Sequence, residues 1–178
     1  MVRALGRGSV SSLLKAVLDV FHFALITVAA VLAIGVIILL LLSFRPDLLN
    51  GRLNIDSLHI AGPWIGPLAA ASLLGFDLYL AGAIVIVGRL RRIFRSLIEG
   101  DPFHPENVRR LNVIAATLAI LEVGRYLAAA ISRLFLKGAL PIHGGVNLSS
   151  WFSILVIVVL AEVFREGARL RGEAELTI

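Results

Sequence analysis

The chain contains no cysteine among its 178 residues. This absence excludes disulfides, thiolate nucleophiles and zinc sites with sulfur ligands, and it leaves the redox compartment open. Charged residues are also scarce, at 16%, whereas 58% of the residues are hydrophobic, and the mean hydropathy is +0.93. A soluble domain of this length would not stay dissolved with so apolar a composition. The composition therefore predicts a membrane protein.

The sequence also lacks the motifs that mark common enzymes. It has no internal repeat, Walker loop, nucleotide fingerprint or nucleophile elbow. His59 and His143 fall on the same side of the membrane in the topology derived below and could form a metal or pH-sensitive pair, but no spacing supports that pairing. We therefore expect no enzymatic activity, no cofactor and no metal site.

Four apolar runs are long enough to cross a hydrocarbon layer of about 30 Å, which takes roughly 20 residues of helix. They cover about residues 20–44, 66–88, 112–133 and 146–165. In lipid each run must be helical, because an open strand would leave backbone groups unpaired. The predicted fold is all-α: one polytopic membrane domain, residues 1–178, with four transmembrane helices in a bundle and a cytoplasmic loop at 89–111.

The basic residues predict the orientation of these spans. The N-terminal arm carries Arg3, Arg7 and Lys15. The second loop carries Arg89, Arg91, Arg92, Arg95, Arg109 and Arg110. The tail carries Arg165, Arg169 and Arg171. The other side carries Arg45, Arg52, Arg133 and Lys137. Because positive charge marks the cytoplasmic side, both termini and the second loop are predicted to be cytoplasmic. The net charge of +5 then reflects topology and contact with anionic lipids, and no direct binding of nucleic acid is expected.

The first half of the second loop has helical periodicity. Apolar residues recur at positions 90, 93, 94, 97 and 98, with Arg91, Arg92 and Arg95 on the other face. The second span is therefore predicted to continue as a cytoplasmic amphipathic helix, either at the lipid surface or packed on the bundle. It should end where Gly100 supplies a left-handed residue just past the last turn.

The stretch GDPFHPENVRRL, residues 100–111, is predicted to turn the chain between the second and third spans. Asp101 and Pro102 form the turn. Pro105 suits the first turn of the next helix, where a missing N–H costs nothing. Glu106 favours the positive end of that helix's dipole. Most of this stretch is thus explained as a helix end, a turn and a helix start.

His104 is the candidate cap of the next helix. With His104 at the cap, Phe103 and Val108 take the two positions of a hydrophobic staple. Asp101, His104 and Glu106 could alternatively supply metal ligands, but this spacing is common by chance and no second histidine is near. We therefore prefer the architectural interpretation of these residues.

Residues 99–111 also resemble part of a known family. A basic amphipathic segment is followed by G-D-P-F, a proline, E-N and the pair Arg109-Arg110 before Leu111 and a hydrophobic helix, all within a four-span chain. This arrangement is similar to the bacterial membrane proteins grouped as domain of unknown function 2975. The candidate cytoplasmic site consists of the residues in this motif: Gly100, Asp101, Pro102, Phe103, Pro105, Glu106, Asn107, Arg109 and Arg110.

Members of that family are often encoded beside a small Xre-like helix-turn-helix regulator. The resemblance therefore implies a non-enzymatic membrane sensor or anchor that regulates or sequesters a cytoplasmic helix-turn-helix transcription regulator. It also implies a bacterial cytoplasmic (inner) membrane location, and homo-oligomers are possible. The resemblance supplies no catalytic residues.

Three charged residues lie near the middle of the predicted spans. Glu122 and Arg125 are three residues apart near the centre of the third run, and Asp77 is at the middle of the second. Charges at this depth cost about 3 kcal/mol or more unless they are buried and paired, so all three should face the bundle interior. They are expected either to hold the second and third helices together or to form a ligand or proton site of a small transporter or permeability component.

Overall fold

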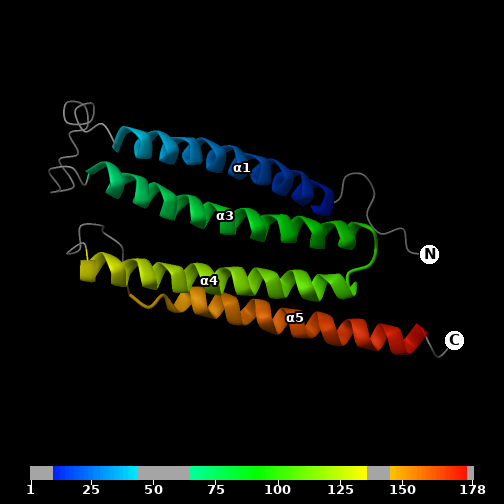
Figure 1. The fold of residues 1–178 in the computed structure, drawn as a ribbon. Coiled ribbons are helices and arrows are strands. Elements are labelled where there is room, and N and C mark those ends of the chain that lie inside the picture. The colour runs from blue at the N-terminus through cyan, green and yellow to red at the C-terminus, as the bar shows by residue number, and fades with distance from the viewer. Residues whose placement is uncertain (1–9, 44–64, 136–144, 176–178) are drawn as a thin grey trace. The chain divides into compact units, whose positions relative to one another are not determined.

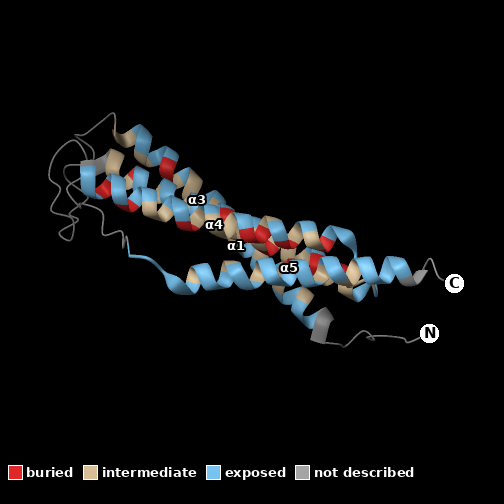
Figure 2. Cartoon of the chain, turned by 90° about the horizontal axis from the view of Figure 1, so that it is seen from below, coloured by how far each residue is buried: buried red, intermediate tan, exposed pale blue. Residues whose placement is uncertain are grey.

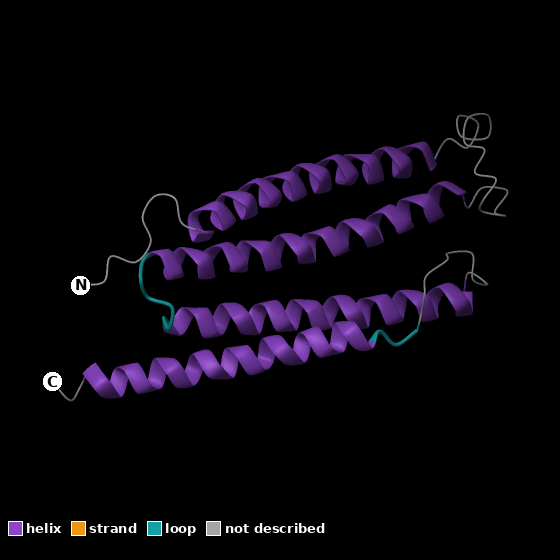
Figure 3. Ribbon diagram, turned by 180° about the vertical axis from the view of Figure 1, so that it is seen from behind, coloured by secondary structure: helices purple, strands orange, loops and turns teal. Residues whose placement is uncertain are grey.

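The computed structural model describes residues 10–43, 65–135 and 145–175. These residues form four α-helices: α1 (Val10–Ser43), α3 (Ile65–Ile98), α4 (Pro105–Phe135) and α5 (Leu148–Glu175). Within the described ranges the remaining residues form turns and short connections, with no strand (Figure 3). The prediction of an all-α fold is confirmed.

Each helix is long and apolar enough to cross a membrane. The spans that meet both criteria are Leu13–Ser43, Pro67–Ile98, Pro105–Leu134 and Leu148–Glu173. Their mean hydropathies run from 1.6 to 3.2, and each exceeds the roughly 20 residues that a hydrocarbon layer requires. The protein is therefore an integral membrane protein with four transmembrane helices.

The helices extend beyond the apolar runs that predict them. α3 continues to Ile98, as its amphipathic periodicity predicts. α1 begins at Val10, well before the apolar run at about residue 20, and α5 continues past residue 165 to Glu175. Hydropathy marks only the lipid-embedded part of a helix, whereas ion pairs on a helix surface can stabilise turns outside it. The α5 extension contains such a pair, Arg169 with Glu173, and in the α1 extension Asp19 pairs with Arg91 of α3.

The chain divides into two compact units, and α1, α3 and α4 each contribute to both. Unit 1 comprises residues 1–24, 82–122 and 147–178. Its described core is formed by Ile93 of α3, Leu111 and Ile114 of α4 and Ala161 of α5, each at most 5% exposed. The six-residue connection between α3 and α4 lies in this unit (Figure 1). Unit 1 therefore contains the whole motif that the sequence singles out.

Unit 2 comprises residues 25–81 and 123–146. Its buried residues in the described ranges are Val36, Ala70, Leu80, Ala129 and Ser132. Four of them are aliphatic, and Ser132 carries a hydroxyl group. α1 and α3 approach closely here, since a Cβ added to Gly35 would lie 3.4 Å from a methyl group of Leu73. Small side chains permit such approach between membrane helices, where van der Waals packing is the main attraction.

α1 and α5 expose apolar side chains along most of their described length (Figure 2). Phe23 is 73% exposed on α1 and Leu155 is 57% exposed on α5. Only 6% of the apolar window of each helix is buried inside the molecule, against 22% for α3 and α4. Exposed apolar surface on this scale is stable in contact with lipid. α3 and α4 supply most of the buried residues, and the candidate site lies where they are joined.

Candidate functional site

The C-terminal end of α3 is closed by Gly100. Its φ is +84°, which confirms the predicted left-handed residue. The N–H of Asp101 donates to the carbonyl of Ser96 at 3.0 Å, and the N–H of Gly100 donates to the carbonyl of Leu97 at 3.2 Å. These two bonds form a Schellman motif, which satisfies carbonyls that a helix end would otherwise leave unpaired. The direction of the chain after α3 is thereby fixed.

The N-terminal end of α4 is capped by His104. Its Nδ1 accepts a hydrogen bond from the N–H of Glu106 at 3.2 Å, and its carbonyl accepts one from the N–H of Asn107 at 2.8 Å. Pro105 is the first helical residue and Glu106 the acidic residue of the first turn. The predicted register of the cap is confirmed. His104 thus has a structural role, in which its Nδ1 accepts a hydrogen bond from the backbone.

Asn107 is the most completely buried residue of the motif, at 0% exposure. Its Nδ2 donates to the hydroxyl of Ser96 at 2.7 Å and to the carbonyl of Pro102 at 3.0 Å. Ser96 in turn donates to the carbonyl of Ile93 at 2.8 Å. A buried amide is costly unless its donors and acceptors are satisfied. Asn107 therefore joins the end of α3, the turn and the start of α4 in one network.

Arg110 completes that network from the next turn of α4. Its Nη1 donates to Oδ1 of Asn107 at 2.8 Å and to the carbonyl oxygen of Arg92 at 3.1 Å. Both acceptors are neutral groups. The guanidinium is thus held in one orientation against the backbone of α3. Arg109, the other member of the basic pair, is exposed and lies 4.0 Å from Glu106 in its own helix.

Phe103 connects the turn to α5. Its ring centroid lies 5.7 Å from that of Phe164, with the planes inclined by 54°. A Cβ added to Gly167 would lie 2.5 Å from a ring carbon of Phe103, so a larger residue at this position would require the ring to move. This contact with α5 is not part of the staple with Val108 that the sequence predicts. The sequence reasoning missed it because it requires tertiary proximity.

Two ion pairs join separate parts of unit 1. Asp101 of the turn pairs with Arg171 of α5 at 2.5 Å. Asp19 of α1 pairs with Arg91 of α3. All four side chains are between 31% and 47% exposed, so solvent screens both pairs and each is worth about 1 kcal/mol or less. Their main effect is to fix which helices meet.

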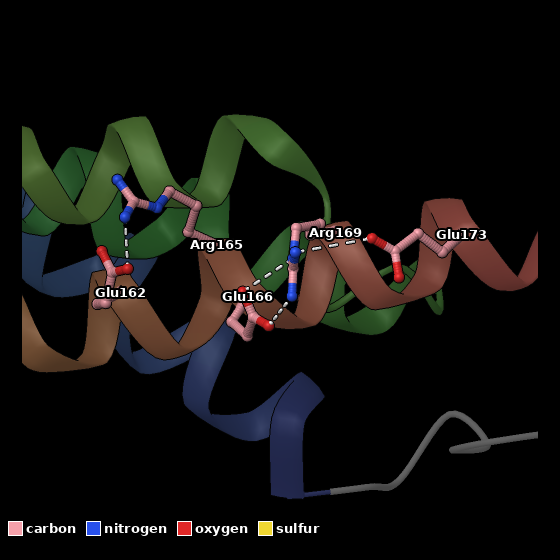
Figure 4. Close-up of polar contacts among 5 residues, drawn as sticks. All are labelled: Glu162, Arg165, Glu166, Arg169 and Glu173. Atoms are coloured by element: carbon pink, nitrogen blue, oxygen red, sulfur yellow. Dashed lines mark hydrogen bonds and ion pairs between the residues drawn. The ribbon is translucent and has the colours of Figure 1, made fainter.

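The last turns of α5 carry a ladder of ion pairs (Figure 4). Arg165 lies 2.5 Å from Glu162, three residues before it in the same helix. Arg169 lies 2.6 Å from Glu166 and 3.8 Å from Glu173. Pairs at these spacings stabilise a helix by about 0.2–0.5 kcal/mol each. The ladder therefore supports the extension of α5 beyond its apolar run.

The three charged residues in the middle of the spans differ in their surroundings. Oδ1 of Asp77 is buried without a hydrogen-bond partner, and Asp77 has no ion pair within the described ranges. Glu122 is buried, at 7% exposure. Nη2 of Arg125 donates to the carbonyl of Gly145 at 3.0 Å, and its guanidinium lies 4.8 Å from the centre of the Tyr126 ring.

Asp77 and Arg125 thus have separate surroundings within the described residues. A backbone carbonyl and an aromatic face both offer an arginine favourable contacts. Helical spacing identified the charges correctly as residues within the spans, but it does not determine the direction of a long side chain.

Several predicted features lie outside the described residues. They are His59 and His143, together with the basic residues Arg3, Arg7, Arg45, Arg52 and Lys137. Among the residues that are described, no group of three or more potential ligands could hold a metal ion. The metal interpretation of Asp101, His104 and Glu106 thus gains no support, since Asp101 pairs with Arg171 and His104 caps α4.

The family model described as "Protein of unknown function (DUF2975)" matches residues 58–178, which include α3, α4, α5 and the whole network around Asn107. The chain belongs to the DUF2975 family. α1 precedes the matched residues. No match was found among curated proteins or among solved structures.

Proposed function

We propose that this DUF2975 protein is a non-enzymatic membrane sensor or anchor that binds a cytoplasmic helix-turn-helix transcription regulator. The observation that carries the proposal is the rigid turn between α3 and α4. Asn107, at 0% exposure, fixes this turn to both helices, and Phe103 and Asp101 fix it to α5. A preorganised surface binds a partner without the cost of ordering loops. The resemblance to a family often encoded beside such regulators supports the choice of partner.

The proposal places the turn on the cytoplasmic side of a bacterial inner membrane. The positive-inside pattern of the basic residues supports this orientation. The turn, the end of α3 and the last turns of α5 would then face the compartment where a transcription regulator resides. Both chain termini would lie in the same compartment.

The charges near the turn limit how such a partner can dock. A helix-turn-helix protein presents a basic surface to DNA, and like charge opposes contact between that surface and the arginines of α3. Of the acidic residues here, Asp101 is engaged by Arg171 and Glu106 lies near Arg109. Glu99 is exposed beside them. We therefore place the contact at Glu99 and Glu106, with the partner's DNA-binding face turned away or covered.

Site-specific photocrosslinking in cells tests the proposal. A photoreactive phenylalanine analogue at Glu99 should capture the helix-turn-helix regulator, which mass spectrometry would identify. The same analogue at Leu127, which is 59% exposed on the transmembrane part of α4, is the matched control and should not capture it. Capture that is equal at both positions, or absent at Glu99 when the regulator is expressed, contradicts the proposal.

Transport remains the alternative, and one observation favours it. The carboxylate of Asp77 has a buried oxygen without a partner in the apolar part of α3, and ionisable groups at such depth commonly mark ion or proton pathways. The described chain does not show the broken helices that build transporter sites. Proton flux into vesicles that is abolished by Asp77→Asn, with crosslinking at Glu99 unchanged, would favour transport.

A further inference from the structure

The arginines of unit 1 fall into two sets. Those of the first set lie within 4.0 Å of a carboxylate: Arg91, Arg109, Arg165, Arg169 and Arg171. Those of the second set have no carboxylate partner in the part of the chain that the structure describes: Arg89, Arg92, Arg95 and Arg110. The second set therefore carries positive charge that the described chain does not neutralise.

The second set lies together. Arg89 and Arg92 follow Val85 at the i+4 and i+7 positions of α3, so these residues share one side of the helix, and Arg95 is three residues further on. Arg110 of α4 joins them because its Nη1 is 3.1 Å from the carbonyl oxygen of Arg92. We call Arg89, Arg92, Arg95 and Arg110 the arginine face.

The arginine face begins where the apolar part of α3 ends. Val85, directly before it on the same side, is 40% exposed, and Ile120 of α4 is 70% exposed. α3 and α4 are in contact at this level, since a Cβ on Gly82 would lie 2.6 Å from Leu121. From Arg89 to Arg95 the helix rises about 9 Å, comparable with the layer of roughly 5–8 Å that lipid headgroups occupy on each side of the hydrocarbon core.

We propose that the arginine face binds the phosphate headgroup of an anionic phospholipid, whose acyl chains run along the exposed apolar residues next to it. A guanidinium offers a planar fork of donors that matches phosphate oxygens and is more weakly hydrated than an ammonium group. Arg110 is held in place by two hydrogen bonds, from its Nη1 to Asn107 and to the carbonyl of Arg92. Both bonds use Nη1, so the N–H groups of Nη2 and Nε can donate to a phosphate. This inference does not depend on the proposed regulator.

The position of the arginine face favours a lipid over an acidic segment of a protein. The half-exposed Val85 adjoins Arg89 on the same side of α3, so a ligand that contacts both must have an apolar part next to an anionic part. A phospholipid has this composition. An acidic peptide would have to enter the headgroup layer and compete there with the anionic lipids already attracted by basic residues.

Native mass spectrometry of the full chain tests the inference. The purified protein in detergent is titrated with dioleoyl phosphatidylglycerol or dioleoyl phosphatidylcholine, and bound lipid is counted. Phosphatidylglycerol should bind in preference. The triple variant Arg89→Gln, Arg92→Gln, Arg95→Gln should bind it more weakly, by roughly fivefold for each arginine removed. The matched control Arg109→Gln, Arg165→Gln, Arg169→Gln loses the same charge from residues that pair within their own helices, and it should bind like the wild type.

Three outcomes would overturn the proposal. The first is unchanged phosphatidylglycerol binding in the Arg89, Arg92 and Arg95 variant, and the second is equal loss in the control, which would show a general charge effect. The third is protection from thermal unfolding by glycerol phosphate or a polyglutamate peptide as strong as that by phosphatidylglycerol, which would indicate a soluble anion or a protein ligand. If the triple variant does not fold, Arg92→Gln alone should show the fivefold loss, and wild-type binding by that variant would contradict the inference.

Discussion

The side-chain nitrogen of Asn107 lies 2.7 Å from the hydroxyl oxygen of Ser96, in a place where Asn107 has no exposed surface. This bond joins the first turn of α4 to the last turns of α3. The same amide reaches Pro102 in the turn and Arg110 in the next helical turn. One side chain thus connects the parts of the motif that hydropathy alone would assign to a loop.

Asn107→Ala should lower the free energy of unfolding by about 2–4 kcal/mol, because it removes the side-chain donor to the carbonyl of Pro102 and one of the two acceptors of the Arg110 guanidinium. Ser96→Ala should cost about 1 kcal/mol, since Asn107 keeps its other bonds. Thermal and denaturant unfolding in detergent measure both. Asn112→Ala, at an exposed asparagine of the same helix, is the matched control and should change stability by less than about 0.5 kcal/mol. Similar losses for Asn107→Ala and Asn112→Ala would show that the network contributes nothing.

Gly167→Ala should destabilise the protein by about 1–3 kcal/mol, because the new methyl group would overlap the ring of Phe103. The melting temperature in detergent reports the change. Gly172→Ala on the same helix is the control: nothing lies within 4 Å of the added Cβ, and helix propensity predicts a gain of up to about 1 kcal/mol. In the double variant Phe103→Ala, Gly167→Ala the loss should be less than additive. Strict additivity would mean that the ring and the glycine are not in contact.

Asp77 and Arg125 should show little energetic coupling. Because Arg125 donates to Gly145 and Asp77 has no ion pair within the described ranges, Asp77→Asn should not rescue the stability lost in Arg125→Met. A double-mutant cycle should give a coupling below about 0.5 kcal/mol. Asp77→Leu should be neutral or stabilising, since it removes a buried oxygen without a partner. A coupling above about 1 kcal/mol would contradict this expectation and would indicate an ion pair between the two residues.

The orientation can be measured with single cysteines, because the chain has none of its own. Two substitutions report the two sides of the membrane: Glu99→Cys, at an exposed residue just after α3, and Val146→Cys, just before α5. The side chain of Val146 is 76% exposed. In intact cells an impermeant maleimide should label Val146→Cys and leave Glu99→Cys unmodified. A permeant maleimide should label both variants. The reverse pattern with the impermeant reagent would place the turn outside the cell and remove the basis for a cytoplasmic partner.

The burial of Asn107 could have been predicted from the periodicity of α4. Asn107, Leu111, Ile114 and Ala115 recur at i, i+4, i+7 and i+8, and all are buried. Asn107 therefore lies on the apolar stripe of α4, where a polar side chain must find partners. Its place on that stripe could have identified it as the centre of a network, although not the groups that it contacts.

The sequence by itself determined the features that depend on local physics. Long apolar runs must be helical in lipid, Gly100 can adopt a positive φ at low cost, and Pro105 with Glu106 begins a helix. These features are short-range, so the residues nearby are sufficient to predict them. The family resemblance, which the match to residues 58–178 confirms, also rests on the local order of residues in the turn.

Only the tertiary structure decided which partners the side chains take. Phe103 packs on Phe164 and Asp101 pairs with Arg171, from parts of the chain that no local pattern connects. Arg125 donates to the carbonyl of Gly145, 20 residues further along the chain. A long flexible side chain can reach groups in several directions, and the competition among them is settled by packing, desolvation and the backbone groups that still lack a hydrogen bond.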